Sequence, residues 1–193
     1  MQSSPAQAVV DADGRRDLTI ERVDTVTIRV PLDRVYKGSH YKMTHRSTII
    51  TRIHTSSGIV GEAYVGDEDA DLFDIQRIIA DELAPRLIGQ DGFAVERIWE
   101  LTRPATWDIL RDRRLGLVAC ASIDAAMWDA VGKALGLPLW KLWGGYTNRL
   151  PVISIGGYYA EDADPAREVA ELVEAGYAGM KFKVGGLTPD EDV

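Results

Sequence analysis

Two lysines separated by one residue are the first side chains in this sequence that could do chemistry. Lys181 and Lys183 lie in the segment GMKFKV, residues 179–184, whose composition predicts a β-strand. Because side chains alternate along a strand, both lysines share one face, opposite the apolar residues of the segment. Two like charges two residues apart on a strand, roughly 7 Å, disfavour each other's protonation. The pair therefore predicts a lysine with a lowered pKa that acts as a base near neutral pH.

The lysine pair has a second interpretation. Lysines also alternate on exposed edge strands, where their charges block aggregation between sheets. A pair of lysines alone does not separate a base from a solvated edge, so the flanking elements have to be considered.

The elements around the pair predict a parallel α/β structure. Residues 150–156 form a wholly apolar run, which is typical of a strand buried on both faces. Residues 164–176 predict a helix with Asp164 at its N-cap, and a second helix begins at Thr188. In a barrel of this β-α-β-α order, both lysines would lie at the C-terminal end of a strand, where barrel active sites are built.

The preceding part of the chain predicts a different architecture. β-Branched runs predict a strand over 18–30 and a hairpin of 46–55 with 59–65, and a long loop over 31–43 separates them. Apolar residues at helical spacing predict helices over 70–87, 94–106 and 115–135. Cys120, Asp124 and Asp129 lie on the third helix, where core packing, capping or ion pairing suits them better than catalysis or metal binding. His54 likewise suits a structural or surface role.

Bulk composition excludes several classes of protein. The 193 residues carry a net charge of −8, which argues against nucleic acid or an anionic membrane as a partner. The single cysteine excludes an intramolecular disulfide and suits a cytoplasmic location. No uninterrupted apolar run has the length of a membrane span. Residues 1–17 have no apolar centre and predict a flexible leader.

Several motifs together resemble one known family. The segments are Ser122 to Lys133 (SIDAAMWDAVGK), Leu137-Pro138-Leu139, Leu142-Trp143-Gly144-Gly145, the hairpin Gly58 to Ala63, and the lysine strand. They resemble the mandelate racemase / muconate-lactonizing enzyme family of the enolase superfamily, with Trp143 where leucine is usual. The resemblance implies an α+β capping domain over residues 18–149, followed at 150–193 by the truncated start of a (β/α)8-type barrel.

The resemblance also implies a chemistry. Enolase-superfamily enzymes remove the proton α to a carboxylate with Mg²⁺ and a lysine or histidine base. Carried over by position, Lys183 is the base, and Lys181 lowers its pKa and helps to hold the substrate carboxylate. The metal ligands are expected beyond residue 193, with none in this chain, so the chain alone is expected to show no turnover.

The reaction itself stays open among three alternatives. The first is dehydration or racemisation of a hydroxy acid or sugar acid by the full-length enzyme. The second is a cycloisomerase or an epimerase of amino-acid derivatives, and the third is an inactive fragment that lacks the metal site. The expected partner is a small carboxylate substrate, and the full-length protein is expected to form a homo-oligomer.

Several further residues are candidates for substrate binding. Tyr36, His40 and Tyr41 lie in the predicted loop after the first strand, which closes over the active site in the family that the chain resembles. Tyr158, like its neighbour Tyr159, follows the first predicted barrel strand, on the catalytic side of a barrel, where one of the two is expected to contact substrate. The alternative is that the loop is solvated and that Tyr158 only packs.

Overall fold

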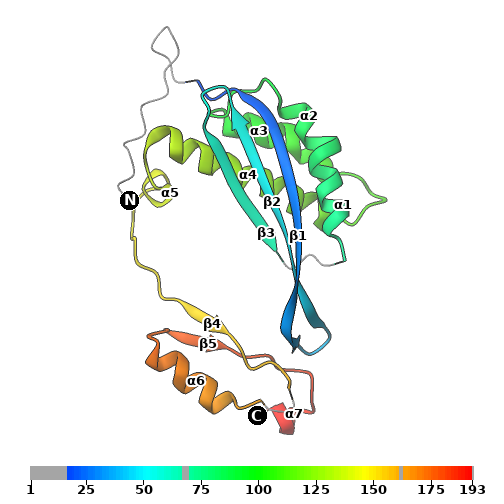
Figure 1. Ribbon diagram of the computed structural model, residues 1–193, viewed down its shortest axis with the longest axis vertical. Helices are drawn as coiled ribbons and strands as arrows, with labels where there is room; N and C mark the ends of the chain where they lie inside the picture. Colours follow the sequence, from blue (N-terminus) through cyan, green and yellow to red (C-terminus); the bar gives the residue numbers. More distant parts are fainter. Residues whose placement is uncertain (1–16, 67–69, 161–162, 193) are drawn as a thin grey trace. The chain divides into compact units, whose positions relative to one another are not determined.

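The computed structural model describes residues 17–66, 70–160 and 163–192. It divides the chain into two compact units, both visible in Figure 1. Unit 1 comprises Met1–Arg29 and Ser47–Tyr146, and unit 2 comprises Val30–Arg46 and Thr147–Val193. The predicted leader lies outside the described residues except for Asp17, and the predicted boundary between residues 149 and 150 stays a prediction.

The sheet of unit 1 has three strands in the order β1-β2-β3. The strands are β1 (Ile20–Lys37), β2 (Lys42–Thr55) and β3 (Val60–Gly66). β2 and β3 pair antiparallel, which confirms the predicted hairpin. Gly58 closes their turn with a φ of 77°, a left-handed conformation that glycine adopts without strain.

The predicted loop over 31–43 is wrong for most of its length. β1 continues through Pro31 to Lys37, and β2 begins at Lys42. Because β1 is an edge strand, a proline can be accommodated where its missing N–H is not needed by a partner strand. The long hairpin therefore extends from unit 1 into unit 2, and Tyr36 lies on a strand, not in a loop.

Helices cover one face of the sheet of unit 1 (Figure 1). A continuous helical stretch consists of α1, a π-helical turn and α2, and it is followed by α3 with a 3₁₀ turn, then by α4 and α5. Their bounds are Leu72–Arg77, Ile78–Leu83, Ala84–Leu87, Val95–Thr102, Arg103–Thr106, Arg113–Leu135 and Leu139–Leu142. The three predicted helices are therefore confirmed, although π and 3₁₀ turns interrupt the first two.

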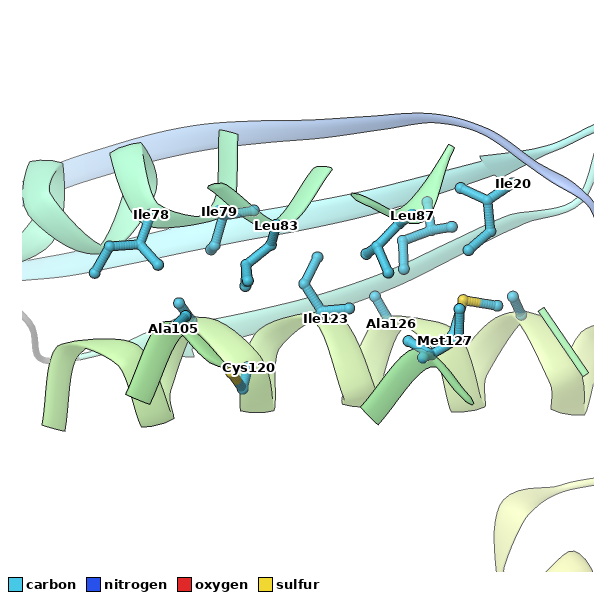
Figure 2. Close-up of a cluster of buried hydrophobic side chains, with 14 of the residues drawn as sticks. Ile20, Ile78, Ile79, Leu83, Leu87, Ala105, Cys120, Ile123, Ala126 and Met127 are labelled. Atoms are coloured by element: carbon cyan, nitrogen blue, oxygen red, sulfur yellow. The ribbon is translucent and has the colours of Figure 1, made fainter. Parts of the chain in front are cut away.

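The core of unit 1 lies between the sheet and these helices. Figure 2 shows side chains from the π-helical turn and α2 facing those of α4, and the labelled members are Ile20, Ile78, Ile79, Leu83, Leu87, Ala105, Cys120, Ile123, Ala126 and Met127. The Cys120 thiol donates to the carbonyl of Thr102 at 3.3 Å, and burial raises its pKa. The prediction that Cys120 is a core residue is confirmed.

Helix α4 ends at the predicted residue, Leu135, but begins at Arg113, two residues before the predicted start. The Asp112 side chain caps it by accepting from the Arg114 amide at 2.8 Å, and Gly136 ends it with a φ of 65°. By length and apolar composition α4 could cross a membrane, but 56% of its most apolar stretch is buried inside the fold. This burial is what the central helix of a folded core shows.

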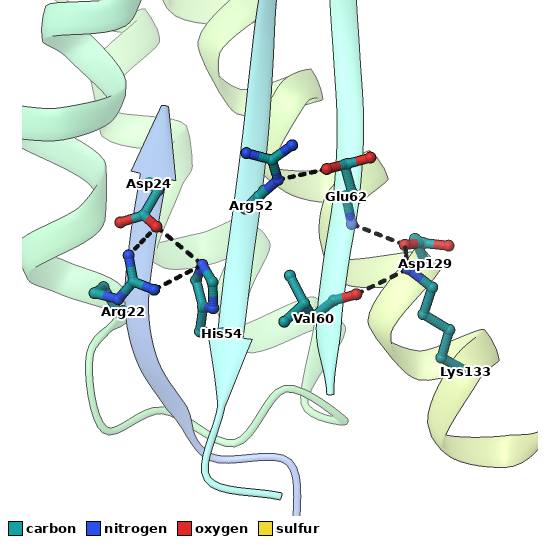
Figure 3. A network of polar contacts seen from close by, with 8 residues as sticks. All are labelled: Arg22, Asp24, Arg52, His54, Val60, Glu62, Asp129 and Lys133. Atoms are coloured by element: carbon teal, nitrogen blue, oxygen red, sulfur yellow. Dashed lines mark hydrogen bonds and ion pairs between the residues drawn. The ribbon is translucent and has the colours of Figure 1, made fainter. Parts of the chain in front are cut away.

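A polar network runs across the three strands of unit 1 (Figure 3). Asp24 pairs with Arg22 and lies 2.9 Å from Nε2 of His54. Burial, together with Arg22 and Arg52, lowers the pKa of His54, and Arg52 pairs with Glu62 on β3. His54 is therefore part of a structural surface network, as its sequence context predicts.

The network continues from β3 to α4 through Asp129. Its carboxylate accepts from the Glu62 amide at 2.7 Å and pairs with Lys133 at 2.6 Å. The Lys133 ammonium also donates to the carbonyl of Val60 at 2.8 Å. These contacts confirm the ion-pair role predicted for Asp129. Burial raises the pKa of Asp124, which forms no such ion pair within the described residues.

Unit 2 contains a β-α-β arrangement. Its elements are β4 (Ile153–Ile155), α6 (Pro165–Glu174), β5 (Gly179–Lys181) and the short helix α7 (Pro189–Asp192). β4 and β5 pair in parallel, with α6 between them in the chain. Asp164 caps α6 by accepting from the Arg167 amide at 3.0 Å, so the predicted helix and its cap are confirmed.

Both strands of unit 2 are shorter than predicted. Ile153 and Ile155 are 56% and 52% exposed, so the prediction that this strand is buried on both faces is wrong for the described chain. The sheet has two strands, and too little of the described chain packs on it to bury both isoleucines. β5 ends at Lys181, and Lys183 therefore lies in the segment that follows the strand.

The approach of β3 to α4 depends on Gly61. A Cβ at this position would lie 2.1 Å from the carbonyl oxygen of Ala126 and 2.8 Å from the Cβ of Ala130. We expect Gly61→Ala to lower the free energy of unfolding of unit 1 by about 1–3 kcal/mol, because overpacking forces the helix from the sheet. Urea denaturation followed by tryptophan fluorescence measures this, since all five tryptophans, from Trp99 to Trp143, belong to unit 1.

Gly66→Ala on the same strand is the matched control. Its added Cβ meets nothing closer than 3.7 Å, so we expect a change within about 0.5 kcal/mol. Equal effects of the two substitutions would show that the contact at Gly61 does not limit the packing of α4.

Candidate active site

Lys183 lies between two tyrosine rings in unit 2. Its Nζ is 5.5 Å from the centre of the Tyr41 ring and 5.2 Å from the centre of the Tyr158 ring. Tyr41 comes from the turn between β1 and β2, and Tyr158 from the segment after β4. Both distances are those of cation–π contacts. The structure therefore brings together three of the predicted site residues from segments far apart in the sequence.

The row of rings and cations continues along β1. Tyr36 meets Tyr158 edge to face, with ring centres 5.1 Å apart and an interplanar angle of 83°. The guanidinium of Arg34 lies 4.7 Å from the centre of the Tyr36 ring. Arg34 was not predicted as a site residue. Its position two residues before Tyr36 places both on one face of a strand, a signal that the interpretation of 31–43 as a loop concealed.

The Tyr41 ring packs closely against Gly38. A Cβ on Gly38 would lie 2.3 Å from Cε1 of Tyr41, and the Gly38 amide donates to the Tyr41 carbonyl at 2.9 Å. Any larger residue at this position would displace the ring that contacts Lys183. His40, in the same turn, is exposed, and its predicted role in substrate binding stays a prediction.

An open cavity of about 880 Å³ lies beside Lys183 in unit 2. Basic, aromatic and acidic side chains line the cavity, among them Lys37, Tyr158, Tyr159, Phe182, Lys183, Glu191 and Asp192. Phe182 and Lys183 both line it, whereas Lys181 is exposed and is not part of the lining. The predicted face shared by Lys181 and Lys183 therefore does not form one wall of the cavity, because β5 and its alternation end at Lys181.

The expected lowering of the Lys183 pKa is not found. A side-chain hydrogen bond with Tyr41 raises the pKa of Lys183 above its ordinary value, and the negative potential of the Tyr41 and Tyr158 phenols adds to this. Desolvation lowers the pKa of Lys183, but its effect is smaller than that of the hydrogen bond. The like charge of Lys181, on which the expectation rested, is not among the causes, since solvent screens exposed charges. In this structure Lys183 is an ammonium at neutral pH.

The loop after Lys183 is held by Tyr159, one of the two tyrosines that follow the first predicted barrel strand, and by Asp192, which was not predicted as a site residue. The Tyr159 hydroxyl donates to Asp192 at 2.6 Å and accepts from the Gly186 amide at 2.9 Å. Nothing in the local sequence pairs Tyr159 with Asp192, since 33 residues separate them. Only the parallel arrangement of β4 and β5 places the segments that follow the two strands next to each other.

The described residues do not offer a magnesium site. Across 17–66, 70–160 and 163–192, no three His, Cys, Asp or Glu side chains are grouped so that they could hold a metal ion. The carboxylates of the cavity have other partners, because Asp192 accepts from Tyr159 and Gly185, and Glu191 accepts from Thr188. The residues present therefore do not fit the metal that the resemblance implies.

The sequence profile of one family matches most of the described part of unit 1 and the hairpin residues 30–46 of unit 2. It is described as the mandelate racemase / muconate lactonizing enzyme N-terminal domain, and it matches residues 20–144. A solved structure of a mandelate racemase/muconate lactonizing enzyme is 61% identical, with a TM-score of 0.86, and the match covers 91% of this chain and 48% of that chain. A second such structure, from a marine actinobacterium and in complex with magnesium, is 57% identical with a TM-score of 0.80 and covers 91% of this chain and 46% of that chain.

Curated relatives have several enzymatic activities. Arabinonate dehydratase of Saccharolobus solfataricus is 34% identical, over 75% of this chain and 39% of that enzyme. The 3,6-anhydro-alpha-L-galactonate cycloisomerase of Streptomyces coelicolor is 32% identical, over 90% of this chain and 48% of that enzyme. The chain thus spans about half the length, or less, of the curated relatives that it matches. With a domain profile over residues 20–144, the chain belongs to the mandelate racemase / muconate lactonizing enzyme family of the enolase superfamily.

Proposed function

We propose that the protein that carries this chain removes the proton α to the carboxylate of a small acid in a Mg²⁺-dependent reaction, with Lys183 as the base. The observation that supports this most directly is the position of Lys183, which follows a parallel strand and lines a cavity together with Lys37 of the β1–β2 hairpin. Relatives that are dehydratases, racemases and cycloisomerases support the same class of reaction.

The same proposal gives unit 2 its place in a larger fold. We propose that β4, α6 and β5 are the first β-α-β of a (β/α)8-type barrel, and that the sheet and helices of unit 1 form its capping domain. Parallel pairing across a helical crossover supports this, because barrels are built from this repeat. The exposure of Ile153 and Ile155 also supports it, since further barrel strands and helices would cover these side chains.

The proposed step moves one proton. The Lys183 amine takes the proton from the α-carbon, the C–H electron pair passes into the carboxylate to give an enediolate, and the lysine becomes an ammonium. Lys181 and the cations around the cavity would attract the carboxylate. We propose that the Mg²⁺ ligands of the full-length protein lie outside the described residues, among which no such group of side chains is found. Magnesium is present in the relative from the marine actinobacterium and in a racemase from Streptomyces coelicolor.

The resting state of Lys183 sets a requirement for this step. An ammonium cannot accept a proton, and Tyr41 favours the ammonium. Base action therefore requires that the occupied site lower this pKa. Exclusion of water from the cavity does so, because burial disfavours the charged form of lysine. Release of the hydrogen bond to Tyr41 acts in the same direction.

The substrate class that we favour is a sugar acid or another hydroxy acid, to be dehydrated or racemised. The tyrosines and cations around the cavity suit a polar, anionic ligand, and Tyr36, His40, Tyr41 and Tyr158 are the proposed contacts. Cycloisomerisation and epimerisation of an amino-acid derivative remain the second candidate, which a cycloisomerase and an N-succinyl-L-Arg/Lys racemase among the relatives favour. Assembly into a homo-oligomer is part of the proposal for the full-length protein.

The first prediction concerns turnover. In D₂O with Mg²⁺ and a panel of sugar acids, we expect the full-length protein to exchange the α-proton, and Lys183→Ala and Lys183→Arg to lower the rate by about 10²–10⁴-fold. Arginine keeps the positive charge but does not lose its proton, so it separates base action from charge. Proton NMR of the substrate measures the exchange. The 193-residue chain alone is expected to show none.

Lys141→Ala is the control for this experiment, because Lys141 lies on α5 in unit 1. It is expected to leave exchange unchanged. Two results would contradict the proposal: α-proton exchange by the 193-residue chain alone, or wild-type exchange by the Lys183→Arg protein.

A second prediction concerns the protonation of Lys183. Tyr41→Phe removes the hydrogen bond that raises the pKa of Lys183, so we expect that pKa to fall toward its ordinary value of 10.5. NMR titration of the lysine side-chain signals, assigned with Lys183→Arg, measures the shift. Because the folded-state pKa is raised, the contact stabilises the fold below pH 10.5, and this contribution is lost as the pH rises through the raised pKa.

Tyr177→Phe is the matched control, since Tyr177 lies in unit 2 outside the row of rings around Lys183. This substitution should leave the pKa of Lys183 the same as in the unsubstituted chain. A Lys183 pKa that stays the same or rises in Tyr41→Phe would show that the Tyr41 hydroxyl does not favour the ammonium.

A further inference from the structure

We propose that Tyr159 is the positioning residue of Lys183: its hydroxyl fixes the glycine turn that follows the lysine, and its backbone fixes the hairpin that supplies Tyr41. The inference rests on the proposed function of Lys183 as a base. Tyr159 is not proposed to touch the reacting atoms, and its effect on catalysis passes through Lys183.

The hydroxyl of Tyr159 joins two parts of the segment after β5. It donates to Oδ1 of Asp192 at 2.6 Å and accepts from the amide of Gly186 at 2.9 Å. The other carboxylate oxygen of Asp192 accepts from the amide of Gly185. The three contacts form a closed set around the Gly185–Gly186 turn, which begins two residues after Lys183.

The ring of Tyr159 packs directly on this turn. A Cβ added to Gly186 would lie 2.5 Å from Cε2 of Tyr159, so glycine is what allows the ring to approach the backbone. Gly185 has a φ of 84°, a left-handed conformation that other residues rarely adopt. A glycine pair is flexible by itself, and the tyrosine supplies the contacts that hold it in one conformation.

The backbone of Tyr159 reaches the hairpin. Its amide donates to the carbonyl of Lys37 at 2.9 Å, at the end of β1 and next to the turn that holds Tyr41. One residue therefore fixes both segments that meet at the Lys183 ammonium. Tyr158, its neighbour, supplies one of the two rings that contact that ammonium.

The charge states of the pair suit a permanent contact. The hydrogen bond from Tyr159 lowers the pKa of Asp192, and the same bond to Asp192 raises the pKa of Tyr159. At neutral pH the aspartate is therefore an ionised acceptor and the tyrosine a protonated donor. A charge-assisted hydrogen bond of this kind is stronger than one between neutral groups.

Amide hydrogen exchange on the 193-residue chain tests this placement without any need for turnover. We expect Tyr159→Phe to speed the exchange of the Gly185 and Gly186 amides at least about tenfold. The hydroxyl that accepts from Gly186 is gone, and Asp192, which accepts from Gly185, loses its contact with Tyr159. The Ala178 amide, which donates to the Val152 carbonyl at 2.8 Å, is the internal reference for the folding of unit 2. Its exchange should not change.

Two further variants keep the test decisive. Tyr177→Phe removes a tyrosine hydroxyl elsewhere in unit 2 and should leave Gly185 and Gly186 protected. If Tyr159→Phe also exposes Ala178, Asp192→Asn replaces it, because this variant keeps the Tyr159 ring and hydroxyl but removes the charge and one of the two acceptor oxygens that hold Tyr159 and Gly185. The variant that keeps Ala178 protected decides the test. If the exchange rates of both glycine amides in that variant stay within twofold of those in the unsubstituted chain, the proposal is overturned.

Kinetics of the full-length protein separate this inference from the proposed function. Tyr159→Phe should lower kcat for α-proton exchange about tenfold or more with KM nearly unchanged, as expected when a base is held less well in place. Wild-type activity in Lys183→Arg would refute the base and leave the exchange result intact. An inactive Lys183→Arg with a wild-type kcat in Tyr159→Phe would refute only the positioning role.

Discussion

The contact of the Lys183 ammonium with two tyrosine rings organises the candidate site. Lys183 follows a parallel strand of unit 2, Tyr158 follows the neighbouring strand, and Tyr41 comes from a hairpin more than a hundred residues earlier in the chain. A lysine that follows a short exposed strand would otherwise sample many rotamers. The rings limit that freedom, and the Lys37–Tyr159 hydrogen bond together with the space at Gly38 keeps the rings in place.

Residues of the β1–β2 hairpin belong to both compact units. Its first part belongs to the sheet of unit 1, which α4 holds through Gly61 and through Asp129 and Lys133. Its tip belongs to unit 2, where it meets the segment that follows β4. A long two-stranded arm is stiffer than a loop of the same length, because cross-strand hydrogen bonds fix its backbone. The tip therefore offers a defined surface, with Arg34 and Tyr36 placed by strand geometry and Tyr41 placed by the turn between the strands.

Much of this fold follows from local sequence signals. The helix cap at Asp164, the end of α4 before Gly136 and the hairpin turn at Gly58 depend on neighbouring residues, so the sequence alone predicts them. The extent of β1 does not follow, because Pro31 normally ends a strand and only its edge position allows it here. The Lys183 pKa was predicted in the wrong direction for a similar reason. The like charge of Lys181 is visible in the sequence, whereas the stronger partner, Tyr41, is brought near only by the fold. The Tyr159–Asp192 pair is likewise absent from the sequence prediction, because only the fold brings these two residues together.

The pH profile of α-proton exchange tests most directly whether Lys183 is a base governed by its tyrosine contacts. The full-length protein and its Tyr41→Phe variant would be compared with the same sugar acid in D₂O at saturating Mg²⁺. We expect the exchange rate to rise with pH as one group loses its proton, and the midpoint of that rise to move to lower pH in Tyr41→Phe. A midpoint that is identical in the two proteins, or that persists in Lys183→Arg, would contradict this assignment, because the titrating base would then be a different residue.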